Sequence, residues 1–321
     1  MAINEVDDLF NGGLESKMDF LNDQKSNVSN DGIYRVDLSK CKDKKKGWRS
    51  VVRFLPNLTK DGKVGQSAID KITHYVDIKN PKELSGWFDS PKNFNEKCTL
   101  TDLYYQMQNS KNAILVEKSK MLKYSKKYYS YVLVLEDEQQ PELVGKIMIF
   151  QYGKTIKDKI LAEKNGEISG VPCTVFDLKA GKDFVLVVKE IQTGEETYPD
   201  YKMSMFKPET TTIPLFSKEK GVFKNVPLNS DGQIDQNIQV KIREFLLDRE
   251  HDLEEFAAKH LTEEQQAKIT EITNFLLSKS SSSFTSTKQE AKPTTSDFEF
   301  EDNFTSTSGA DEDEDDFFSN L

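Results

Sequence analysis

The sequence contains no long apolar run, few cysteines and few histidines. None of its 321 residues lies in an apolar segment long enough to cross a bilayer, and no basic segment followed by an apolar one opens the chain. The cysteines Cys41, Cys98 and Cys173 are odd in number and far apart, which excludes a disulfide framework and a Cys-x-x-Cys metal knuckle. We therefore expect a soluble intracellular protein that has no contact with membranes.

The sequence motifs of common enzyme sites are also missing. The chain has no Gly-x-x-x-x-Gly-Lys phosphate loop, no His-Glu-x-x-His motif and no Gly-x-Ser-x-Gly nucleophile elbow. Its histidines, His74, His251 and His260, are too scattered to predict a shared ligand role. The acidic run at residues 311–316 lacks the rigid support that catalytic carboxylates need. We expect no enzymatic activity.

The net charge of −10 is spread unevenly along the chain. Residues 280–321 hold eleven acidic residues and two lysines, a net charge of −9, which leaves −1 for residues 1–279. In the nearly neutral remainder, residues 40–63 hold nine basic residues against two acidic ones, and residues 111–127 hold six lysines against Glu117. Two basic stretches of this kind are compatible with nucleic-acid binding, whereas the total charge alone argues against it.

Short runs of β-branched and aromatic residues predict a β-rich core. Each run is bounded by Gly, Pro or charged turns, and the second ends at Pro56, which cannot continue a central ladder. Five strands in this style suggest a mixed β fold with helices, built on an OB-fold-like five-stranded barrel. The predicted strands are residues 33–38, 50–55, 129–135, 146–152 and 184–189.

Changes in pattern along the chain predict its domain organisation. Helical spacing of apolar residues, with a capping box at Thr262 and Gln265, predicts one or two helices beside the barrel, and a long excursion between two strands predicts an inserted subdomain. Low complexity and acidity predict a disordered end. The predicted parts are an N-terminal arm at 1–30, a core at 31–279 with an insertion at 59–127 and helices at 235–279, and an acidic C-terminal tail at 280–321.

Lysines and arginines alternate with aromatic residues in several of the predicted strands. A groove for single-stranded nucleic acid needs cations for the phosphates and flat side chains for unpaired bases, so this alternation predicts such a groove. One strand of this kind is more often ordinary core with a solvated rim, but four segments together favour binding. The predicted contact residues are Arg49, Arg53, Lys123, Lys126, Lys127, Tyr128, Tyr129, Phe150, Tyr152, Lys154, Tyr198, Tyr201 and Phe206.

The acidic tail ends in apolar side chains, which a purely solubilising segment does not require. A tethered polyanion can compete with DNA for a basic groove, and terminal aromatic residues can anchor partner proteins. We predict a partner-binding tip formed by Asp313, Asp315, Asp316, Phe317, Phe318 and Leu321.

From about residue 34 to 206, and again in the tail, the sequence resembles the single-stranded-DNA-binding (helix-destabilising, gene 32) proteins of T-even-like bacteriophages. The resemblance implies an OB-fold core that binds single-stranded DNA cooperatively in phage replication, recombination and repair, in the cytoplasm of an infected bacterial host. It assigns DNA contacts to the positions of Arg53, Tyr128, Tyr129, Phe150, Tyr198 and Tyr201. The segments that carry it are residues 51–56, 128–135, 145–146, 150–154, 158–160, 172–173, 184–189 and 198–206.

Two departures from that family alter the expectations. The family's inserted subdomain holds zinc with one histidine and three cysteines, whereas here only His74 and Cys98 remain and the other positions fall near Lys92 and Thr101. We therefore expect no cofactor, with Trp87, Phe88, Phe94 and Tyr104 holding the subdomain as an aromatic cluster; Asp89 or Asp102 would be substitute ligands if zinc were present. The family's basic N-terminal motif is replaced by acidic residues, Glu5, Asp7 and Asp8.

Two other functions remain compatible with these patterns. An RNA-binding OB-like module would use the same stacking platforms, since aromatic side chains do not distinguish ribose from deoxyribose. An interaction scaffold would act through its acidic tail and bind no DNA even without it. The expected partners are single-stranded DNA, further copies of the chain along that DNA, and replication and recombination proteins held by the tail.

Overall fold

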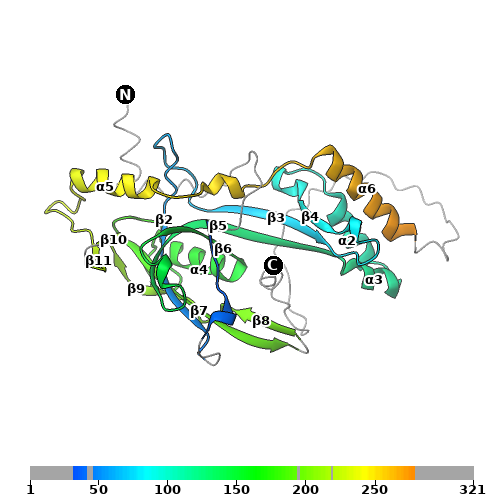
Figure 1. The fold of residues 1–321 in the computed structure, drawn as a ribbon, viewed down its shortest axis with the longest axis horizontal. Coiled ribbons are helices and arrows are strands. Elements are labelled where there is room, and N and C mark those ends of the chain that lie inside the picture. The colour runs from blue at the N-terminus through cyan, green and yellow to red at the C-terminus, as the bar shows by residue number, and fades with distance from the viewer. Residues whose placement is uncertain (1–31, 42–45, 194–195, 218–219, 279–321) are drawn as a thin grey trace.

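The computed structural model describes residues 32–41, 46–193, 196–217 and 220–278. These residues form a mixed structure of sheet and helices, with a larger sheet-based part and a smaller helical part joined by long strands (Figure 1). No helix in these ranges has the length and apolar character needed to span a membrane. The predicted arm and tail, including all six residues of the predicted tip, lie outside the described residues.

One large sheet contains all five predicted strand segments, although only the first two residues of the 33–38 segment are in a strand. Its main path runs β1-β6-β5-β2-β7-β8, while β3 pairs with β5 and β4, and β9 pairs with β7. The strands are β1 (Ile33–Tyr34), β2 (Trp48–Leu55), β3 (Ile69–Val76), β4 (Gly86–Asp89), β5 (Leu122–Asp137), β6 (Ile147–Tyr152), β7 (Gly181–Thr193), β8 (Glu196–Asp200) and β9 (Met205–Thr211). A separate hairpin joins β10 (Pro214–Ser217) to β11 (Val222–Asn225).

The pairing of the described strands does not close into the predicted barrel. The edge strand β1 has two residues and pairs with β6, and among the described strands no pairing joins that edge to β9. Two other strands are long: β5 has 16 residues and β7 has 13, well beyond the usual five or six. The first half of β5 pairs with β3 and the end of β7 pairs with β8, so both strands carry the sheet outward past the core. β5 thus runs continuously from the larger part into the smaller part (Figure 1).

The two faces of this sheet bury separate hydrophobic cores. Side chains of neighbouring strand residues point to opposite faces, and β5 follows this rule. Val132 and Val134 enter one cluster, the inner core, together with Trp48, Phe54 and Phe184. Tyr131 and Leu133 enter the other cluster, the outer core, which also contains Leu55, Ile149, Ile242, Leu246 and Leu253.

Helices cover both faces of the sheet. α4 (Lys154–Lys164) lies within the curve of the sheet, and its Ile156 and Ile160 belong to the inner core (Figure 1). α5 (Gln236–Leu247) and the 3-10 turn η7 (Leu253–Phe256) cover the outer core. The predicted helices at 235–279 are confirmed as α5, η7 and α6 (Glu263–Ser278), and the predicted capping box is present in reciprocal bonds between Thr262 and Gln265.

The inserted segment forms its own cluster, the subdomain core. The elements of the inserted segment are β3, β4, α2 (Thr99–Gln108), α3 (Ala113–Ser119) and the start of β5. Side chains of α6, which comes much later in the chain, complete the subdomain core. Shorter 3-10 turns are η3 (Leu38–Lys40), η4 (Lys82–Leu84), η5 (Pro91–Phe94) and η6 (Pro141–Leu143). The buried members are mostly aliphatic, among them Val76, Ile78, Leu100, Leu103, Leu122, Ile269, Ile272 and Leu276.

The aromatic cluster predicted to hold this subdomain does not form as one unit. Trp87 and Phe88 are neighbours on β4 and therefore point to opposite faces, so Trp87 packs on Tyr75 at 4.7 Å between ring centroids while Phe88 enters the subdomain core. Phe94 instead stacks on His260 at 3.7 Å. Of the four predicted residues, Phe88 belongs to the subdomain core and Tyr104 packs against it.

Candidate nucleic-acid interface

The adjacent tyrosines of β5 cannot share one groove, because they lie on opposite faces of the sheet. Tyr129 packs against Phe256 of η7 in the outer core, with ring centroids 5.4 Å apart. Tyr128 faces the other way and stacks on Tyr152 of β6 at 5.8 Å, with 20° between the ring planes. The prediction that both rings line one surface is therefore wrong, and Tyr128 is the ring that has lysines over it.

Two lysines lie over the Tyr128 ring. The Nζ of Lys126, two residues earlier on the same face of β5, is 5.6 Å from the ring centroid, and the Nζ of Lys157 on α4 is 6.0 Å from it. Lys126 also pairs with Asp70 of β3 at 2.7 Å, yet 39% of its side chain stays exposed. Both ammonium groups are within the range of cation–π attraction to the ring while keeping access to solvent.

The start of α4 brings further cations to this place. Lys154 is the exposed first residue of the helix, and Lys157 follows one turn later on the same side. Lys159 donates from Nζ to the carbonyl of Lys202 at 3.2 Å, which ties α4 to the turn after β8. From that turn Tyr201 packs against the inner core. We call Lys126, Tyr128, Lys154 and Lys157 the Tyr128 patch.

Arg53 lies inside the protein, with only 1% of its surface exposed. Its guanidinium pairs with Asp183 at 3.2 Å and donates to the hydroxyl and carbonyl oxygens of Thr211 at 2.9 and 2.6 Å and to the carbonyl of Asp177 at 3.1 Å. Burial lowers the pKa of Arg53, and the charge of Asp183 opposes that shift. The predicted phosphate contact of Arg53 does not agree with this geometry, because its donors are used within the fold.

Most of the predicted stacking residues are core residues. Phe150, Tyr152 and Phe206 are at most 7% exposed and belong to the inner core. Tyr128 is also 7% exposed and belongs to the same core, but two lysines lie over its ring. The Tyr152 hydroxyl bonds to Ser130 Oγ at 2.9 Å, and burial raises the pKa of that hydroxyl. Phe206 packs on Phe184 at 4.7 Å. Their alternation with other residue types in the sequence follows from the pleat of a strand, because neighbouring side chains point to opposite faces.

The remaining predicted contacts are dispersed. Arg49 is exposed on β2 and pairs with Glu136 at 3.7 Å, on the same face as Arg53 and therefore away from Tyr128. Lys127 is buried, and Tyr198 is half-buried on β8 opposite Ile191. Lys123 lies on β5, but its side chain is outside the described residues.

Sequence reasoning missed Lys157 because it missed α4. The spacing of Ile156 and Ile160, four residues apart and followed by acids and lysines, is a helical signal that could have identified it. Once α4 is recognised, Lys154 and Lys157 fall on one face of its first turn.

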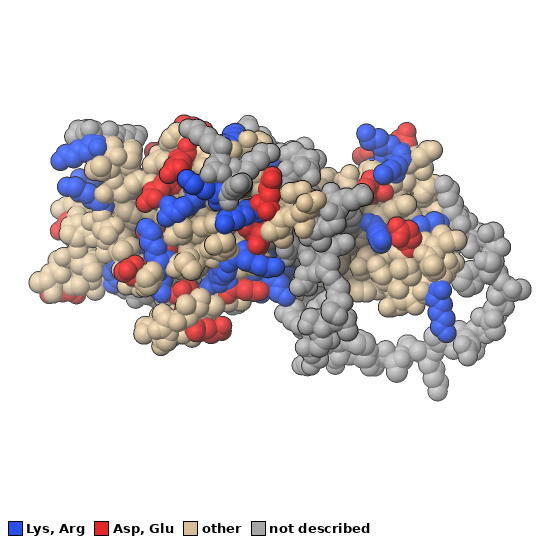
Figure 2. All heavy atoms as spheres, turned by 90° about the horizontal axis from the view of Figure 1, so that it is seen from below, with Lys and Arg blue, Asp and Glu red and all other residues tan. Residues whose placement is uncertain are grey.

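The distribution of charged side chains alone does not locate the predicted DNA-binding groove. The face seen from below in Figure 2 carries Lys and Arg side chains interspersed with Asp and Glu over the larger part of the molecule. Ion pairs such as Lys126–Asp70 and Lys207–Asp183 at 3.2 Å account for part of this mixture. A nucleic-acid surface must therefore be located by cations that lie beside aromatic rings.

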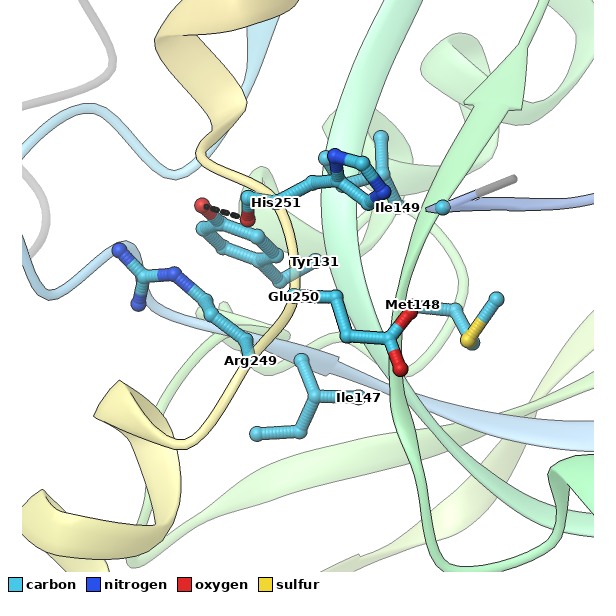
Figure 3. Close-up of a pocket in the computed structure, with 8 residues that line it drawn as sticks. Tyr131, Ile147, Met148, Ile149, Arg249, Glu250 and His251 are labelled. Carbon is cyan, nitrogen blue, oxygen red and sulfur yellow. Dashed lines mark hydrogen bonds between the residues drawn. The ribbon is translucent and has the colours of Figure 1, made fainter. Parts of the chain in front are cut away.

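A small pocket lies elsewhere, where the connection after α5 crosses β6 (Figure 3). Tyr131 donates to the carbonyl of His251 at 3.2 Å and accepts from the backbone N–H of Leu253 at 2.6 Å, while the Arg249 guanidinium lies 4.3 Å from the Tyr131 ring. These bonds tie the connection to the outer core, so we assign the pocket a packing role. Its lining residues are Gly32, Tyr131, Ile147, Met148, Ile149, Arg249, Glu250 and His251.

His74, Ser90, Cys98 and Thr101 meet inside the subdomain. His74 Nε2 lies 3.2 Å from Cys98 Sγ, 3.2 Å from Thr101 Oγ1 and 3.3 Å from Ser90 Oγ. Burial raises the pKa of the Cys98 thiol, but the hydrogen bond to His74 and the other contacts together outweigh burial and lower the pKa to about 6. Asp89 bonds instead to Lys71 and Lys259, and Asp102 pairs with Lys97. Within the described residues no group of three or more His, Cys, Asp or Glu side chains could hold a metal.

Two comparisons place the chain among known proteins. It is similar to the single-stranded DNA-binding protein of Enterobacteria phage T4, with 28% identity over 192 residues, which cover 59% of this chain and 60% of that protein. The chain thus matches less than two thirds of the relative's length. The model of the family described as "gp32 DNA binding protein like" matches residues 46–277, which include both the Tyr128 patch and the subdomain. The chain therefore belongs to the gp32-like DNA-binding protein family.

Proposed function

We propose that this protein binds single-stranded DNA without strong sequence preference and without catalysing a reaction on it. The observation that carries the proposal is the Tyr128 patch, in which an aromatic ring lies beneath two lysines at the edge of the inner core. The membership of residues 46–277 in a DNA-binding family and the similarity to the single-stranded DNA-binding protein of a phage support it. We place the activity in the cytoplasm of an infected bacterial host.

The patch suggests how a strand would be held. Lys126, Lys154 and Lys157 are long flexible cations, and phosphates would draw their ammonium groups away from the Tyr128 ring. Tyr128 itself is only 7% exposed, so this movement of the lysines is what would uncover its ring. A base could then stack on the ring, an interaction that contributes roughly 1 to 3 kcal/mol for any base. Because stacking and phosphate pairing ignore base identity, binding would depend on salt and little on sequence.

A titration at several salt concentrations tests this function. Single-stranded DNA of mixed sequence should bind with an affinity that falls steeply as salt rises, and duplex DNA of equal length should bind more weakly. A matched RNA strand distinguishes the RNA-binding alternative, since tighter RNA binding would favour that module. Failure to bind any single strand, with or without residues 280–321, would leave only the interaction scaffold.

We further propose that the inner core is an OB-like barrel that is only partly closed. Side chains of β2, β5, β6, β7 and β9 all enter the inner core, and α4 lies within the curve of these strands.

We also propose that copies of the chain bind side by side on DNA during replication, recombination and repair. Binding isotherms on long and short oligonucleotides test this, because cooperativity appears only when a lattice holds several copies.

The acidic tail is proposed to compete with DNA and to hold replication and recombination proteins. Residues 280–321 carry a net charge of −9 from eleven acidic residues and two lysines, and they end in Phe317, Phe318 and Leu321. Truncation after Lys279 should tighten DNA binding, most visibly at low salt, and abolish capture of polymerase- or helicase-loading partners. A truncated chain that binds DNA no more tightly and retains those partners would make the tail a solubility device.

A further inference from the structure

Four side chains from separate elements converge inside the subdomain. His74 comes from β3, Ser90 follows β4, Cys98 is the residue before α2, and Thr101 lies in the first turn of α2. All four are buried, with between 0% and 6% of their surface exposed. We call this group the His74 cluster. Its backbone is fixed independently of the side chains, because Ser90 N–H bonds to Ile72 and Asp102 N–H bonds to Cys98.

The three distances from His74 Nε2 to the other members are close to the ligand–ligand distances of a tetrahedral metal site. Zinc sits about 2.0 Å from a histidine nitrogen and about 2.3 Å from a thiolate, so a tetrahedral site places its nitrogen and sulfur ligands roughly 3.5 Å apart. Here Cys98 Sγ, Thr101 Oγ1 and Ser90 Oγ lie 3.2, 3.2 and 3.3 Å from His74 Nε2. The spacing is a few tenths of an ångström shorter, as expected when hydrogen bonds replace metal–ligand bonds.

The hydrogen bonding within the cluster is poorly matched to its members. One imidazole nitrogen carries either one proton or one lone pair, yet three polar atoms surround Nε2. The other ring nitrogen, Nδ1 of His74, is buried and has no hydrogen-bond partner among the described residues. A network formed only for hydrogen bonding would use both nitrogens. In a tetrahedral site three ligands lie at similar distances from the fourth ligand, and the three polar atoms are placed in this way around Nε2.

The donor set, however, does not fit structural zinc. Such sites take four ligands from cysteine, histidine or carboxylate, and two neutral hydroxyls do not replace two thiolates. Here one imidazole and one thiol face two hydroxyls, those of Ser90 and Thr101. The family resemblance implies a metal in the subdomain, and the residues present disagree with it.

We propose that the His74 cluster is an incomplete metal site in which hydroxyls occupy two ligand positions, so that the subdomain forms without metal and two substitutions to cysteine would complete a zinc site. The subdomain has another source of stability in α6, whose Ile269, Ile272 and Leu276 enter its core. α6 is further held by Lys268, which donates to the carbonyl of Ser85 at 2.8 Å.

The test compares metal binding by the full chain and by the double variant Ser90→Cys/Thr101→Cys. After dialysis against a mild chelator, the unchanged chain should retain far less than one zinc per molecule, and the double variant should retain about one. Cobalt is a spectroscopic probe of the same site, since a tetrahedral thiolate site gives visible absorption bands. The matched control is Ser119→Cys/Ser130→Cys, two buried serines that bond to Val116 and Tyr152 instead.

Several outcomes would overturn the proposal. The first is stoichiometric zinc in the unchanged chain. The second is a folded double variant that binds no more zinc or cobalt than the control. If the double variant does not fold, Ser90→Cys and Thr101→Cys alone decide the matter, because each adds a third ligand. Each should raise cobalt affinity at least about tenfold, since even outer-shell changes alter metal affinity about 10- to 100-fold. Unchanged affinity in both would reject the ligand geometry.

Discussion

The environment of Arg53 and the Tyr128 patch are two places where the sequence sets a cation beside aromatic residues, and they differ in access to solvent. Arg53 is 1% exposed, and its donors are taken by Asp183, Asp177 and Thr211. In the patch, Lys126 and Lys157 keep 39% and 30% of their side chains exposed above the Tyr128 ring. The first place stabilises the fold, and the second can exchange its contacts for those of a ligand.

The difference shows that alternation of cations and aromatics has two physical origins. On a strand buried on one face, an aromatic residue enters the core and its neighbour points outward, so alternation follows from the pleat alone. A binding surface needs cation and ring on the same face, as with Lys126 and Tyr128, which are two residues apart on β5. The predictions below change one place at a time.

The largest effect is expected from Arg53→Met. This change leaves Asp183 and two buried carbonyls without a buried donor, although Lys207 still reaches Asp183 at 3.2 Å. Loss of one partner of a buried ion pair typically costs about 3 to 5 kcal/mol. Urea denaturation should show that loss, while the DNA affinity of the fraction that remains folded should be unchanged. Normal stability with weakened DNA binding would reverse the assignment.

A smaller effect on binding is expected from Tyr128→Ala. Because Tyr128 is only 7% exposed and packs on Tyr152 in the inner core, the variant should also lose stability, so its DNA affinity is compared for the folded fraction. Loss of one stacking ring should weaken single-stranded DNA binding by roughly 1 to 3 kcal/mol, and Tyr128→Phe should restore most of it because the ring is kept. Affinity can be measured by fluorescence anisotropy with a labelled oligonucleotide of mixed sequence.

Tyr129→Ala is the matched control for that experiment. It removes a ring from the outer core, where it packs on Phe256, so it should lower the free energy of unfolding by about 3 to 5 kcal/mol. Its folded fraction should bind DNA normally. If Tyr128→Ala is folded and binds DNA as well as the unchanged chain, the Tyr128 patch is not the site.

The strands and the final helices were predictable from the sequence because their signals are local. β-branched runs predict β2, β5, β6 and β7, and Pro56 predicts the end of β2 at Leu55. The capping box at Thr262 likewise predicts the start of α6. These patterns depend only on neighbouring residues, so tertiary contacts do not override them.

The sequence did not predict in the same way which face of the sheet each side chain occupies, or which strands extend into the smaller part of the structure. A shift of one residue in register exchanges the two faces of a strand. Alternation predicts that Tyr128 and Tyr129 point in opposite directions, but it does not predict which elements cover each face. The extension of β5 depends on β3, whose paired residues are 46 to 60 positions earlier and carry no strong strand pattern. The burial of Arg53 depends on Thr211, which is 158 residues away in the chain.

A still smaller effect is expected from Lys154→Gln and Lys157→Gln. Each change removes an exposed cation from the Tyr128 patch and should reduce the slope of log affinity against log salt by about one unit, if that lysine pairs with a phosphate. Binding at low salt should weaken by a similar amount for every oligonucleotide sequence. An unchanged slope in the double variant would exclude the start of α4 from the groove.

The smallest effect is expected from Arg49→Gln, which completes the comparison. Arg49 has the charge of the patch lysines and shares the strand and sheet face of Arg53, yet it is exposed and pairs only loosely with Glu136 at 3.7 Å. Exposed ion pairs contribute about 0 to 1 kcal/mol, so the free energy of unfolding should change by no more than that. The salt slope should stay within error of the unchanged chain, because Arg49 points away from the face that holds Tyr128. A slope reduced by a full unit would show that DNA also crosses this second face, and the Tyr128 patch would then be only part of a longer path.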